Sequence, residues 1–401
     1  MTWNSRVLNR HNVCFLSTYA PRKCGIAVFT EDLVNSLNLT SQFASTSVIA
    51  LKKRGEVESC VKKIDWQIAK DEEKDYIQAA IDINSSNVDV VNIQHEFGIF
   101  GGAWGNYILS FLETIKKPVV TTFHTIQPDF EPEALRVLRE IAHRSAAVVV
   151  TGSTAASILS WYGIPDEKIN VIQHGCPDVP FTNSDEVKPL LNLSGRKVLC
   201  TFGLISRGKG IEYAIKALPS IVANHPEVLY LVIGETHPEV KMSEQESYRE
   251  QLLRIVKELG LQNHVEFQNR FITKPELMTY LQATDVYLTP YVGKSQISSG
   301  TLIYALGTGR AVVSTPYLHA KEVLADGRGM LCEFKNPSTI ANAVNRLLAD
   351  EQLKRRMQKK AYEYSRRFTW LEVAKKYAKL FKRVIDYRKE ALSVELPAHQ
   401  A

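Results

Sequence analysis

Several features are missing from this 401-residue sequence, and each absence narrows the possible functions. No apolar run reaches the roughly eighteen residues of a membrane-spanning helix, and the amino-terminal MTWNSRVLNRHN lacks the apolar core of a signal peptide. The six cysteines include no CxxC pair, so we expect reduced thiols rather than disulfides or a zinc site. From these absences we expect a cytoplasmic protein.

Signatures of two ligand classes are also missing. The dinucleotide fingerprint GxGxxG does not occur, which disfavours a dehydrogenase. The net charge of +6 is mild, and because no dense basic stripe is interleaved with aromatic residues, we expect no nucleic-acid partner. The one concentrated basic segment, 375–389, has apolar residues at helical spacing, so we expect an amphipathic helix that packs on the body and leaves a solvated basic face. A weak peripheral membrane contact by this helix is the alternative.

What is present is a regular alternation of short apolar strands and helical patterns. This alternation is typical of parallel sheets covered by helices on both faces, and two series of strands predict an α/β fold with two doubly wound domains. We expect helices over 71–83 and 132–142, among others. The expected strands are residues 13–18, 45–51, 88–94, 118–123, 146–151 and 169–173, then 197–203, 228–235, 264–269, 285–291, 311–315 and 329–334.

The segment 176–193 loses this periodicity and contains three prolines, which is typical of a linker. We therefore expect an amino-terminal domain over 1–182, a second domain over 183–368 and a closing helical segment over 369–401. In open α/β sheets, ligands bind outside the carboxyl ends of the strands. Residues that directly follow strands are therefore the candidates for chemistry.

A glycine-rich loop follows the expected strand 88–94. His95, Glu96 and Trp104 lie there among four glycines, which include Gly101 and Gly102. Aromatic faces and charged hydrogen-bonding groups bind sugars, whereas the simpler interpretation is a structural turn around a buried polar pair. We favour a mobile binding loop, because so many glycines carry an entropic cost that packing alone rarely requires.

Three further residues of the first half occupy turns or strand ends. Gly25 lies in the strand-to-helix loop 17–30, where the backbone can approach a phosphate, although a plain tight turn explains it equally well. His124 ends the strand in PVVTTFHT. A lone histidine is more often structural, but at a strand end of such a sheet a binding role is as well supported as a structural one. His174 precedes Gly175 near the expected linker, so a hinge role is favoured there.

The second half offers two anion-binding candidates. In TFGLISRGKG, Arg207 and Lys209 stand just before a helix, where cations oppose the helix dipole unless an anion such as a diphosphate is bound. Two solvated surface cations are the less favoured interpretation. The second candidate is the start of the helix in SSGTLIYALG, where hydroxyls and free amides gather at Ser298, Ser299, Gly300 and Thr301.

Taken in order, these segments resemble the retaining glycosyltransferases of family 4, the group 1 glycosyltransferases with the two-domain GT-B fold. The resemblance covers nearly the whole chain and rests on PRKCGIAVFTEDL, TTFHT, VIQHG, GLISRGKG, ELMTYLQATDVYLTPY, GTLIYALGTGRAVVST, HAKEVLADGRGMLC and RRFTWLEVAKKY. It implies two Rossmann-like domains with a cleft between them. It also implies a closing helix that begins at Trp370 and crosses back to the first domain.

The resemblance assigns roles residue by residue. Gly25 would lie beside the donor phosphates, Arg207 and Lys209 would hold the diphosphate, and His124 would lie close to the donor sugar. The implied catalytic residues are His124, Arg207, Lys209 and Gln296. The implied donor-binding set adds Gly203, Glu235, Ser298, Ser299, Gly300, Thr301 and Tyr304, and the acceptor-binding set is His95, Glu96, Gly101, Gly102 and Trp104. No metal is implied, and the sequence has no Asp-x-Asp motif.

One departure from the family stands out. The family usually has two glutamates separated by seven residues, and the matching positions here are Gln296 and Tyr304. Gln296 can still hydrogen-bond a sugar but adds no negative charge, and Tyr304 cannot accept two ribose hydroxyls as a carboxylate does. The departure indicates either a subgroup with different donor contacts or a protein without turnover. We favour the subgroup, because Arg207, Lys209 and His124 all remain.

The expected activity is retaining, metal-independent transfer of a hexose from a nucleotide diphosphate sugar, without any cofactor. From the resemblance we expect mannose from GDP-mannose, with a UDP-sugar as the alternative. The acceptor would be a glycan, a lipid-linked sugar or a small molecule. A non-catalytic sugar-nucleotide-binding protein is the second hypothesis. A sugar-nucleotide 2-epimerase is the third and ranks last, because the carboxylates for that chemistry have no clear equivalents.

Overall fold

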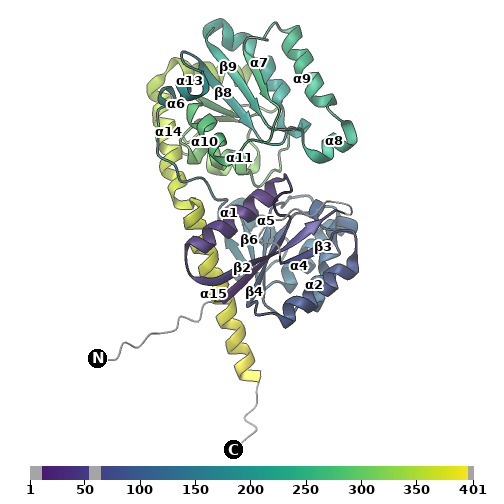
Figure 1. Ribbon diagram of the computed structural model, residues 1–401. Helices are drawn as coiled ribbons and strands as arrows, with labels where there is room; N and C mark the ends of the chain where they lie inside the picture. Colours follow the sequence, from purple (N-terminus) through teal and green to yellow (C-terminus); the bar gives the residue numbers. More distant parts are fainter. Residues whose placement is uncertain (1–10, 54–64, 396–401) are drawn as a thin grey trace, which may run out of the picture. The chain divides into compact units, whose positions relative to one another are not determined.

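The computed structural model describes residues 11–53 and 65–395. These residues form two compact units, each built on a parallel sheet with helices around it (Figure 1). The first unit contains the described residues up to Gln173 together with those from Trp370 onward, and the second contains His174–Thr369. The prediction of two doubly wound α/β domains is confirmed.

Seven parallel strands form the sheet of the first unit: β1 His11–Ser17, β2 Phe43–Lys52, β3 Trp66–Ala69, β4 Val90–His95, β5 Val119–Phe123, β6 Ala147–Val150 and β7 Ile169–Val171. Their order is β3-β2-β1-β4-β5-β6-β7. Every residue of β4 and β5 is buried, as expected for a parallel sheet with both faces covered. The edge strand β3 was not predicted. Its four residues include only one fully buried side chain, Ile68, so its sequence carries little apolar signal.

All but the last of the helices of the first unit connect these strands in the sequence. They are α1 Gly25–Leu39, α2 Glu73–Ser85, α3 Ile108–Thr114, α4 Pro132–Arg144, α5 Ser153–Trp161 and α15 Trp370–Glu395, with short 3₁₀ turns η1 Phe97–Ile99, η2 Ala103–Gly105 and η3 Asp166–Lys168. The helices expected over 71–83 and 132–142 correspond to α2 and α4.

The last helix, α15, belongs to the first unit although it is distant in sequence. Its apolar face, including Tyr377 and Phe381, is buried, and the Tyr377 hydroxyl lies 3.0 Å from Thr122 Oγ1 of β5. The Phe381 ring contacts Phe15 of β1 edge to face, with 6.3 Å between the ring centres. The basic side chains of 375–389 remain exposed. The prediction of an amphipathic helix that packs on the body is confirmed.

The second unit has six parallel strands: β8 Lys197–Phe202, β9 Val228–Ile233, β10 Val265–Gln268, β11 Val286–Thr289, β12 Ala311–Ser314 and β13 Met330–Leu331. Their order is β10-β9-β8-β11-β12-β13, and all six strands were predicted. The surrounding helices are α6 Ser184–Val187, α7 Ile211–Asn224, α8 Pro238–Glu244, α9 Ser247–Glu258, α10 Lys274–Ala283, α11 Gly300–Gly307, α12 Leu318–Val323, α13 Pro337–Ala349 and α14 Glu351–Ser365, with η4 Lys188–Leu191, η5 Arg207–Lys209 and η6 Arg366–Phe368.

The chain passes from the first unit to the second at Gln173–His174, nine residues before the predicted boundary at 182–183. The segment between these positions is held by the second unit. Cys176 donates its backbone N–H to the Phe368 carbonyl at 2.9 Å, and the Tyr362 hydroxyl donates to the Val179 carbonyl at 2.9 Å. The expected linker is therefore an ordered part of the second unit.

A buried carboxylate, Asp285, joins several elements of the second unit. It lies just before β11 and accepts hydrogen bonds from the Val198 N–H of β8 at 2.7 Å and from the Ser184 hydroxyl at 2.9 Å. Its oxygens also lie 2.8 Å from Lys188 Nζ and 3.4 Å from Lys354 Nζ. Burial opposes ionisation, but the two ammonium groups outweigh it and hold the pKa of Asp285 below its ordinary value. The ion pairs are therefore present at neutral pH and are lost only in acid, as the pH falls through that lowered pKa.

Two expectations from composition concern thiols and membranes. The five described cysteines are free, and Cys60 lies outside the described residues. Within residues 11–53 and 65–395, each helix is too short or too polar to cross a membrane. The predicted absence of a signal peptide concerns the first residues, which also lie outside the described part.

Asp285→Ala should destabilise the second unit by about 3–5 kcal/mol, because the substitution leaves Lys188 and Lys354 buried without the carboxylate. Hydrogen exchange measured by mass spectrometry should show the β8 amides exchanging about a hundredfold faster or more. Asp386→Ala on the exposed face of α15 is the matched control and should leave these amides unchanged. Equal exchange in Asp285→Ala and the unmodified protein would contradict this account.

Candidate functional site

In the second unit, the strand order reverses at β8. From β8 the chain proceeds outward to β9 and β10, and it then returns to β11 on the other side of β8. Ligands of open α/β sheets bind at such a reversal, outside the carboxyl ends of the strands. The segments concerned are 203–210 after β8 and 290–299 after β11.

Two glycines allow these segments to approach each other closely. Gly203 has φ +122°, and a Cβ there would lie 3.2 Å from both Lys209 Nζ and Thr301 Cγ2. Gly210 has φ +62°, and a Cβ there would lie 2.1 Å from the Pro290 carbonyl oxygen. Both backbone conformations favour glycine. A side chain at Gly210 would push the two segments apart, and one at Gly203 would crowd Lys209 and Thr301.

Lys209 lies at this reversal and contacts the loop that follows β11. Its Nζ donates to the Tyr291 hydroxyl at 2.6 Å. That hydroxyl lies 2.7 Å from Thr301 Oγ1, which lies 3.3 Å from Ser299 Oγ. Burial opposes ionisation of Tyr291, but the Lys209 ammonium and the hydroxyl contacts outweigh it and lower the pKa of Tyr291. A cation and three hydroxyls therefore gather at one point.

The same point adjoins the first turn of α11. Ser299 is the N-cap residue, and its Oγ accepts the Leu302 N–H at 3.4 Å. Gly300 and Thr301 follow at the first two helical positions, and Ser298 precedes the cap. A helix N-terminus carries unpaired N–H groups and a partial positive charge. Together with Lys209, it forms a site suited to an anion such as a diphosphate.

Arg207 and Lys209 were predicted as a pair, and the structure does not bring their charged groups together. The Arg207 side chain is half exposed and bonds Glu244 Oε2 at 2.9 Å and Gln251 Oε1 at 2.8 Å. Lys209 turns instead to Tyr291. Glu235, another predicted donor contact, is half buried at the end of β9, where its carbonyl accepts the Ile205 N–H at 2.8 Å.

Gln296 and Tyr304 occupy different environments. The Gln296 Nε2 donates to the Ser298 carbonyl at 3.0 Å, so this amide braces the turn before α11. Tyr304 is only 5% exposed, and its ring contacts His174 edge to face with 6.3 Å between the ring centres. Neither residue supplies a carboxylate.

Two buried histidines flank the start of α11. His174 Nδ1 bonds the Gly175 carbonyl at 2.7 Å, and its Nε2 would lie 2.6 Å from a Cβ at Gly300. His319 Nδ1 accepts the Ser299 N–H at 3.0 Å, and its own backbone N–H donates to the Gln296 carbonyl at 3.1 Å. Burial lowers the pKa of each ring to about 4, so both are neutral at physiological pH. His319 was not predicted, because nothing in its local sequence indicates this contact.

In the first unit, the loop after β1 leads directly into α1. Cys24 is the N-cap residue, and its Sγ accepts the Ala27 N–H at 3.3 Å. Gly25 is the first helical residue, and a Cβ there would meet no atom within 4 Å. The prediction that this loop opens a helix is confirmed. The open space beside Gly25 fits the predicted close approach of a ligand to the backbone.

The loop after β4 differs from the prediction in two respects. His95 is fully buried: its ring stacks on Phe100 with 5.5 Å between the ring centres, and burial lowers its pKa to about 3. In this position its side chain cannot contact an acceptor. Gly101 and Gly102 are required by packing, since a Cβ at Gly101 would lie 1.9 Å from the Lys70 carbonyl oxygen and one at Gly102 would lie 2.0 Å from Asn106 Oδ1, whereas a Cβ at Gly98 would meet no atom within 4 Å. The argument that packing rarely explains such glycines was wrong here.

Glu96 and Trp104 fit a binding role better than His95. The Glu96 carboxylate accepts from the Thr125 hydroxyl at 2.5 Å, and burial raises its pKa despite this hydrogen bond. Trp104 is 41% exposed and has φ +53°, an unusual backbone conformation for a large side chain. Its ring contacts Phe97 edge to face with 5.9 Å between the ring centres. An exposed indole is suited to stacking on the apolar face of a sugar.

His124 directly follows β5 and is 9% exposed. Its Nε2 lies 2.8 Å from Gln94 Oε1, and its ring contacts Phe29 of α1 edge to face with 4.8 Å between the ring centres. Its backbone N–H donates to the His95 carbonyl at 3.0 Å. Gln94 was not predicted as a site residue, because its partner lies thirty residues further along the chain.

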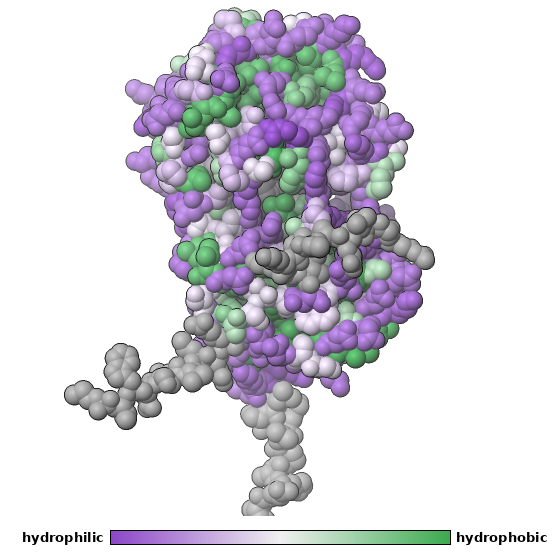
Figure 2. Space-filling view, viewed as in Figure 1, coloured by the Kyte–Doolittle hydropathy of each residue, from purple (hydrophilic) through white to green (hydrophobic). Residues whose placement is uncertain are grey.

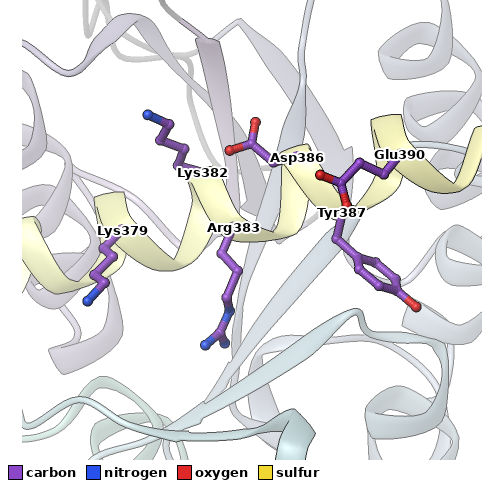
Figure 3. Close-up of a pocket in the computed structure, with 6 residues that line it drawn as sticks. All are labelled: Lys379, Lys382, Arg383, Asp386, Tyr387 and Glu390. Carbon is purple, nitrogen blue, oxygen red and sulfur yellow. The ribbon is translucent and has the colours of Figure 1, made fainter. Parts of the chain in front are cut away.

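The exposed side of α15 carries a separate surface hollow of about 430 Å³. Its lining is charged except for one tyrosine and consists of Lys379, Lys382, Arg383, Asp386, Tyr387 and Glu390. Figure 3 shows Lys379, Arg383 and Tyr387 pointing to one side of the helix, with Lys382 and Asp386 on the other. None of the predicted site residues lines this hollow, so it is distinct from the strand-end sites.

Two family models match the chain. The model described as Glycosyl transferases group 1 matches residues 183–364, and the model described as Glycosyltransferase Family 4 matches residues 75–178. The first match lies within the second unit and contains Lys209, Tyr291 and α11. The second match lies mainly in the first unit, contains Glu96 and His124, and ends five residues into the second unit.

Curated relatives are similar over part of their length. A D-inositol 3-phosphate glycosyltransferase from Corynebacterium urealyticum is 25% identical over 284 residues, which is 68% of this chain and 65% of the relative. A phosphatidyl-myo-inositol mannosyltransferase from Mycolicibacterium smegmatis is 27% identical over 281 residues, covering 68% and 67%. An uncharacterised glycosyltransferase from Methanocaldococcus jannaschii is 26% identical over 230 residues, covering 56% of this chain and 55% of the relative. The matched region thus spans between about half and two thirds of these relatives.

Two solved structures share the fold. Anabaena HepE in complex with UDP and glucose has a TM-score of 0.73 and 16% identity, covering 93% of this chain and all of that one. Sucrose-phosphate synthase from Thermosynechococcus elongatus has a TM-score of 0.77 and 16% identity, covering 94% of this chain and 100% of the other. These structures have the GT-B architecture, and they support the fold predicted here.

His319→Leu should destabilise the second unit by about 1–3 kcal/mol, because it leaves the buried Ser299 N–H without an acceptor. His319→Asn places an oxygen near the position of Nδ1 and should recover much of this loss. Urea unfolding followed by circular dichroism measures both. If the two variants lose stability equally, the loss comes from the packing of the imidazole ring and not from its hydrogen bond with the Ser299 N–H, which would contradict this account.

Proposed function

This chain belongs to the group 1 glycosyltransferases of the GT-B fold, and from this membership we propose that it transfers a hexose from a nucleotide diphosphate sugar to an acceptor hydroxyl. The observation that carries the proposal is the cluster of Lys209, Tyr291 and Thr301 at the first turn of α11. A diphosphate leaving group gains negative charge as the glycosidic bond breaks, and this cluster would stabilise that charge.

The proposed reaction retains the anomeric configuration and requires no metal. The acceptor hydroxyl attacks on the face from which the nucleotide leaves, and the departing phosphate oxygen takes its proton. Lys209 and the N–H groups of α11 supply the electrostatic stabilisation, while Arg207 joins them by exchanging its contact with Glu244 for the diphosphate. From the resemblance to the family, we propose that Gly25 and His124 bind the donor and that Glu96 and Trp104 bind the acceptor.

We propose mannose as the transferred sugar and GDP as the carrier, with UDP-glucose as the alternative. The name of one relative, a phosphatidyl-myo-inositol mannosyltransferase, supports mannose, and the UDP and glucose bound to HepE support the alternative. The acceptor is a glycan, a lipid-linked sugar or a small molecule. The free thiols of the described cysteines support a cytoplasmic location, since that compartment keeps thiols reduced.

A non-catalytic sugar-nucleotide-binding protein is the second candidate. The environment of the two residues that replace the usual glutamates favours it. Gln296 braces a turn, and Tyr304 is buried. In this case the chain would bind a donor without breaking its glycosidic bond. A 2-epimerase remains the third candidate and would convert the donor without any acceptor.

We further propose that the basic face of α15 makes a weak contact with anionic membranes. Lys379, Lys382 and Lys389 are exposed, and none has a carboxylate partner within the described ranges. Tyr387 lies beside them with 75% of its side chain exposed. Lys354 of α14, by contrast, is buried and bonds Asp285 within its unit. Anionic lipid surfaces attract such free basic clusters.

Lys209→Met should abolish the thermal stabilisation that the correct nucleotide gives, because it removes the cation of the diphosphate site. A nucleotide at about one hundred times its dissociation constant adds about 2.7 kcal/mol of stability. A thermal-shift panel of UDP, GDP, ADP and their sugar conjugates measures this effect. Lys216→Met, an equal change of charge at an exposed position of α7, should keep the full shift.

The nucleotide sugar that stabilises the protein in this panel is then used as the substrate of a turnover assay. Nucleotide release that depends on an added acceptor and persists with EDTA would support metal-independent transfer. A thermal shift without any turnover would favour the binding protein, and turnover without acceptor would favour the epimerase. If no nucleotide stabilises the unmodified protein, the transferase proposal fails.

Replacing Lys379, Lys382 and Lys389 by glutamate should reduce binding to vesicles containing about 30% phosphatidylserine by about a hundredfold, because each basic group near an anionic surface contributes to attraction. Vesicle flotation at low salt measures the bound fraction. The matched control replaces Arg355, Arg356 and Lys359 of α14 by glutamate, which changes the charge equally. Equal losses in both triple variants would mean that overall charge, and not the α15 face, governs the contact.

A further inference from the structure

Three buried side chains form a hydrogen-bonded chain at the carboxyl ends of β4 and β5. Asn92 and Gln94 are both 0% exposed and lie two residues apart on β4, so their side chains share one face of the sheet. Asn92 Nδ2 donates to the Val120 carbonyl at 2.9 Å, and Gln94 Nε2 donates to Asn92 Oδ1 at 2.5 Å. Gln94 Oε1 then lies 2.8 Å from His124 Nε2.

The direction of these hydrogen bonds is set by a backbone carbonyl. The Val120 oxygen can only accept, so Asn92 must present its amide nitrogen there and its oxygen to Gln94. Gln94 therefore donates through Nε2 and has only its oxygen left for His124. Two acceptors do not bond to each other, so His124 Nε2 must carry a hydrogen. Reversing either amide would place two oxygens in contact.

A second branch anchors this chain from the side of α15. Thr122 Oγ1 lies 3.5 Å from both Asn92 Nδ2 and Gln94 Nε2, and it lies 3.0 Å from the Tyr377 hydroxyl. Buried polar networks in which each member has a partner are rigid and favour one arrangement. The contact between the His124 ring and Phe29 restricts the remaining rotation of the imidazole.

We propose that Gln94 is a positioning residue that holds His124 in the Nε2–H tautomer, so that the neutral ring offers Nδ1 as a hydrogen-bond acceptor to a sugar hydroxyl. The part of this proposal that concerns the sugar rests on the proposed transferase function. A hydrogen on Nδ1 would instead suit a phosphate oxygen or a carboxylate, which can only accept. The chain through Gln94 thus makes the strand-end histidine selective for a neutral hydroxyl group.

The test of the tautomer needs no activity. NMR of the full-length protein with isotope-labelled histidine distinguishes Nδ1–H from Nε2–H rings by their nitrogen shifts, and His124→Gln identifies the signal. We expect the Nε2–H tautomer in the unmodified protein and a mixture of both tautomers in Gln94→Met. Gln78→Met, at an exposed position of α2, is the matched control and should leave the signal unchanged. A wild-type Nδ1–H ring, or an unchanged ring in Gln94→Met, would overturn the proposal.

A second variant covers the case in which Gln94→Met does not fold. Gln94→Glu keeps the shape of the side chain but places a carboxylate against His124, so the ring should become doubly protonated at neutral pH. An unchanged neutral ring in Gln94→Glu would show that Gln94 does not control His124, which also overturns the proposal.

Binding measurements test the sugar contact separately. In Gln94→Met, the affinity for the nucleotide sugar should fall about threefold to tenfold, the effect of one neutral hydrogen bond, while the affinity for the nucleotide diphosphate alone stays constant. Equal losses for both ligands would overturn the hydroxyl contact. If the unmodified protein binds neither ligand, the transferase function fails, whereas the NMR result still decides the role of Gln94.

Discussion

The second unit depends on one buried charge, the carboxylate of Asp285. It bonds the first residues of β8 and lies directly before β11, so it clamps the amino ends of the two strands whose carboxyl ends carry Lys209 and Tyr291. An unpaired carboxylate in this position would be strongly destabilising, which is why two lysines from different elements accompany it. The alignment of the anion site at one end of the strands is thus maintained by an ion cluster at the other end.

Most of the fold could be predicted from periodicity, and the exceptions have physical causes. Strands buried on both faces, such as β4 and β9, are continuous apolar runs that local sequence reveals. The edge strand β3 has one buried residue of four and therefore no such run. The segment 176–193 reads as a linker because it is aperiodic, yet contacts with residues almost two hundred positions away hold it in the second unit. Aperiodic sequence does not reveal such long-range contacts.

The candidate site was predictable where a residue follows a strand or begins a helix. That rule located Gly25, His124, Lys209 and the start of α11, each of which lies where it was expected. It could not determine where side chains point: Arg207 turns to Glu244, and His95 turns into a cluster of phenylalanines. Gln94 and His319 were missed because their partners come from other elements, and only the folded chain brings these groups together.

The path of the chain has a consequence for biosynthesis. The second unit is continuous in sequence, whereas the first is completed by α15, which follows the second unit in the sequence and whose Tyr377 and Phe381 pack into the core of the first. Domains usually fold in the order in which they are synthesised. Here the amino-terminal sheet must wait, because its last structural element leaves the ribosome after the whole inserted unit. The unit that begins first therefore finishes last, and its apolar face stays uncovered for most of translation.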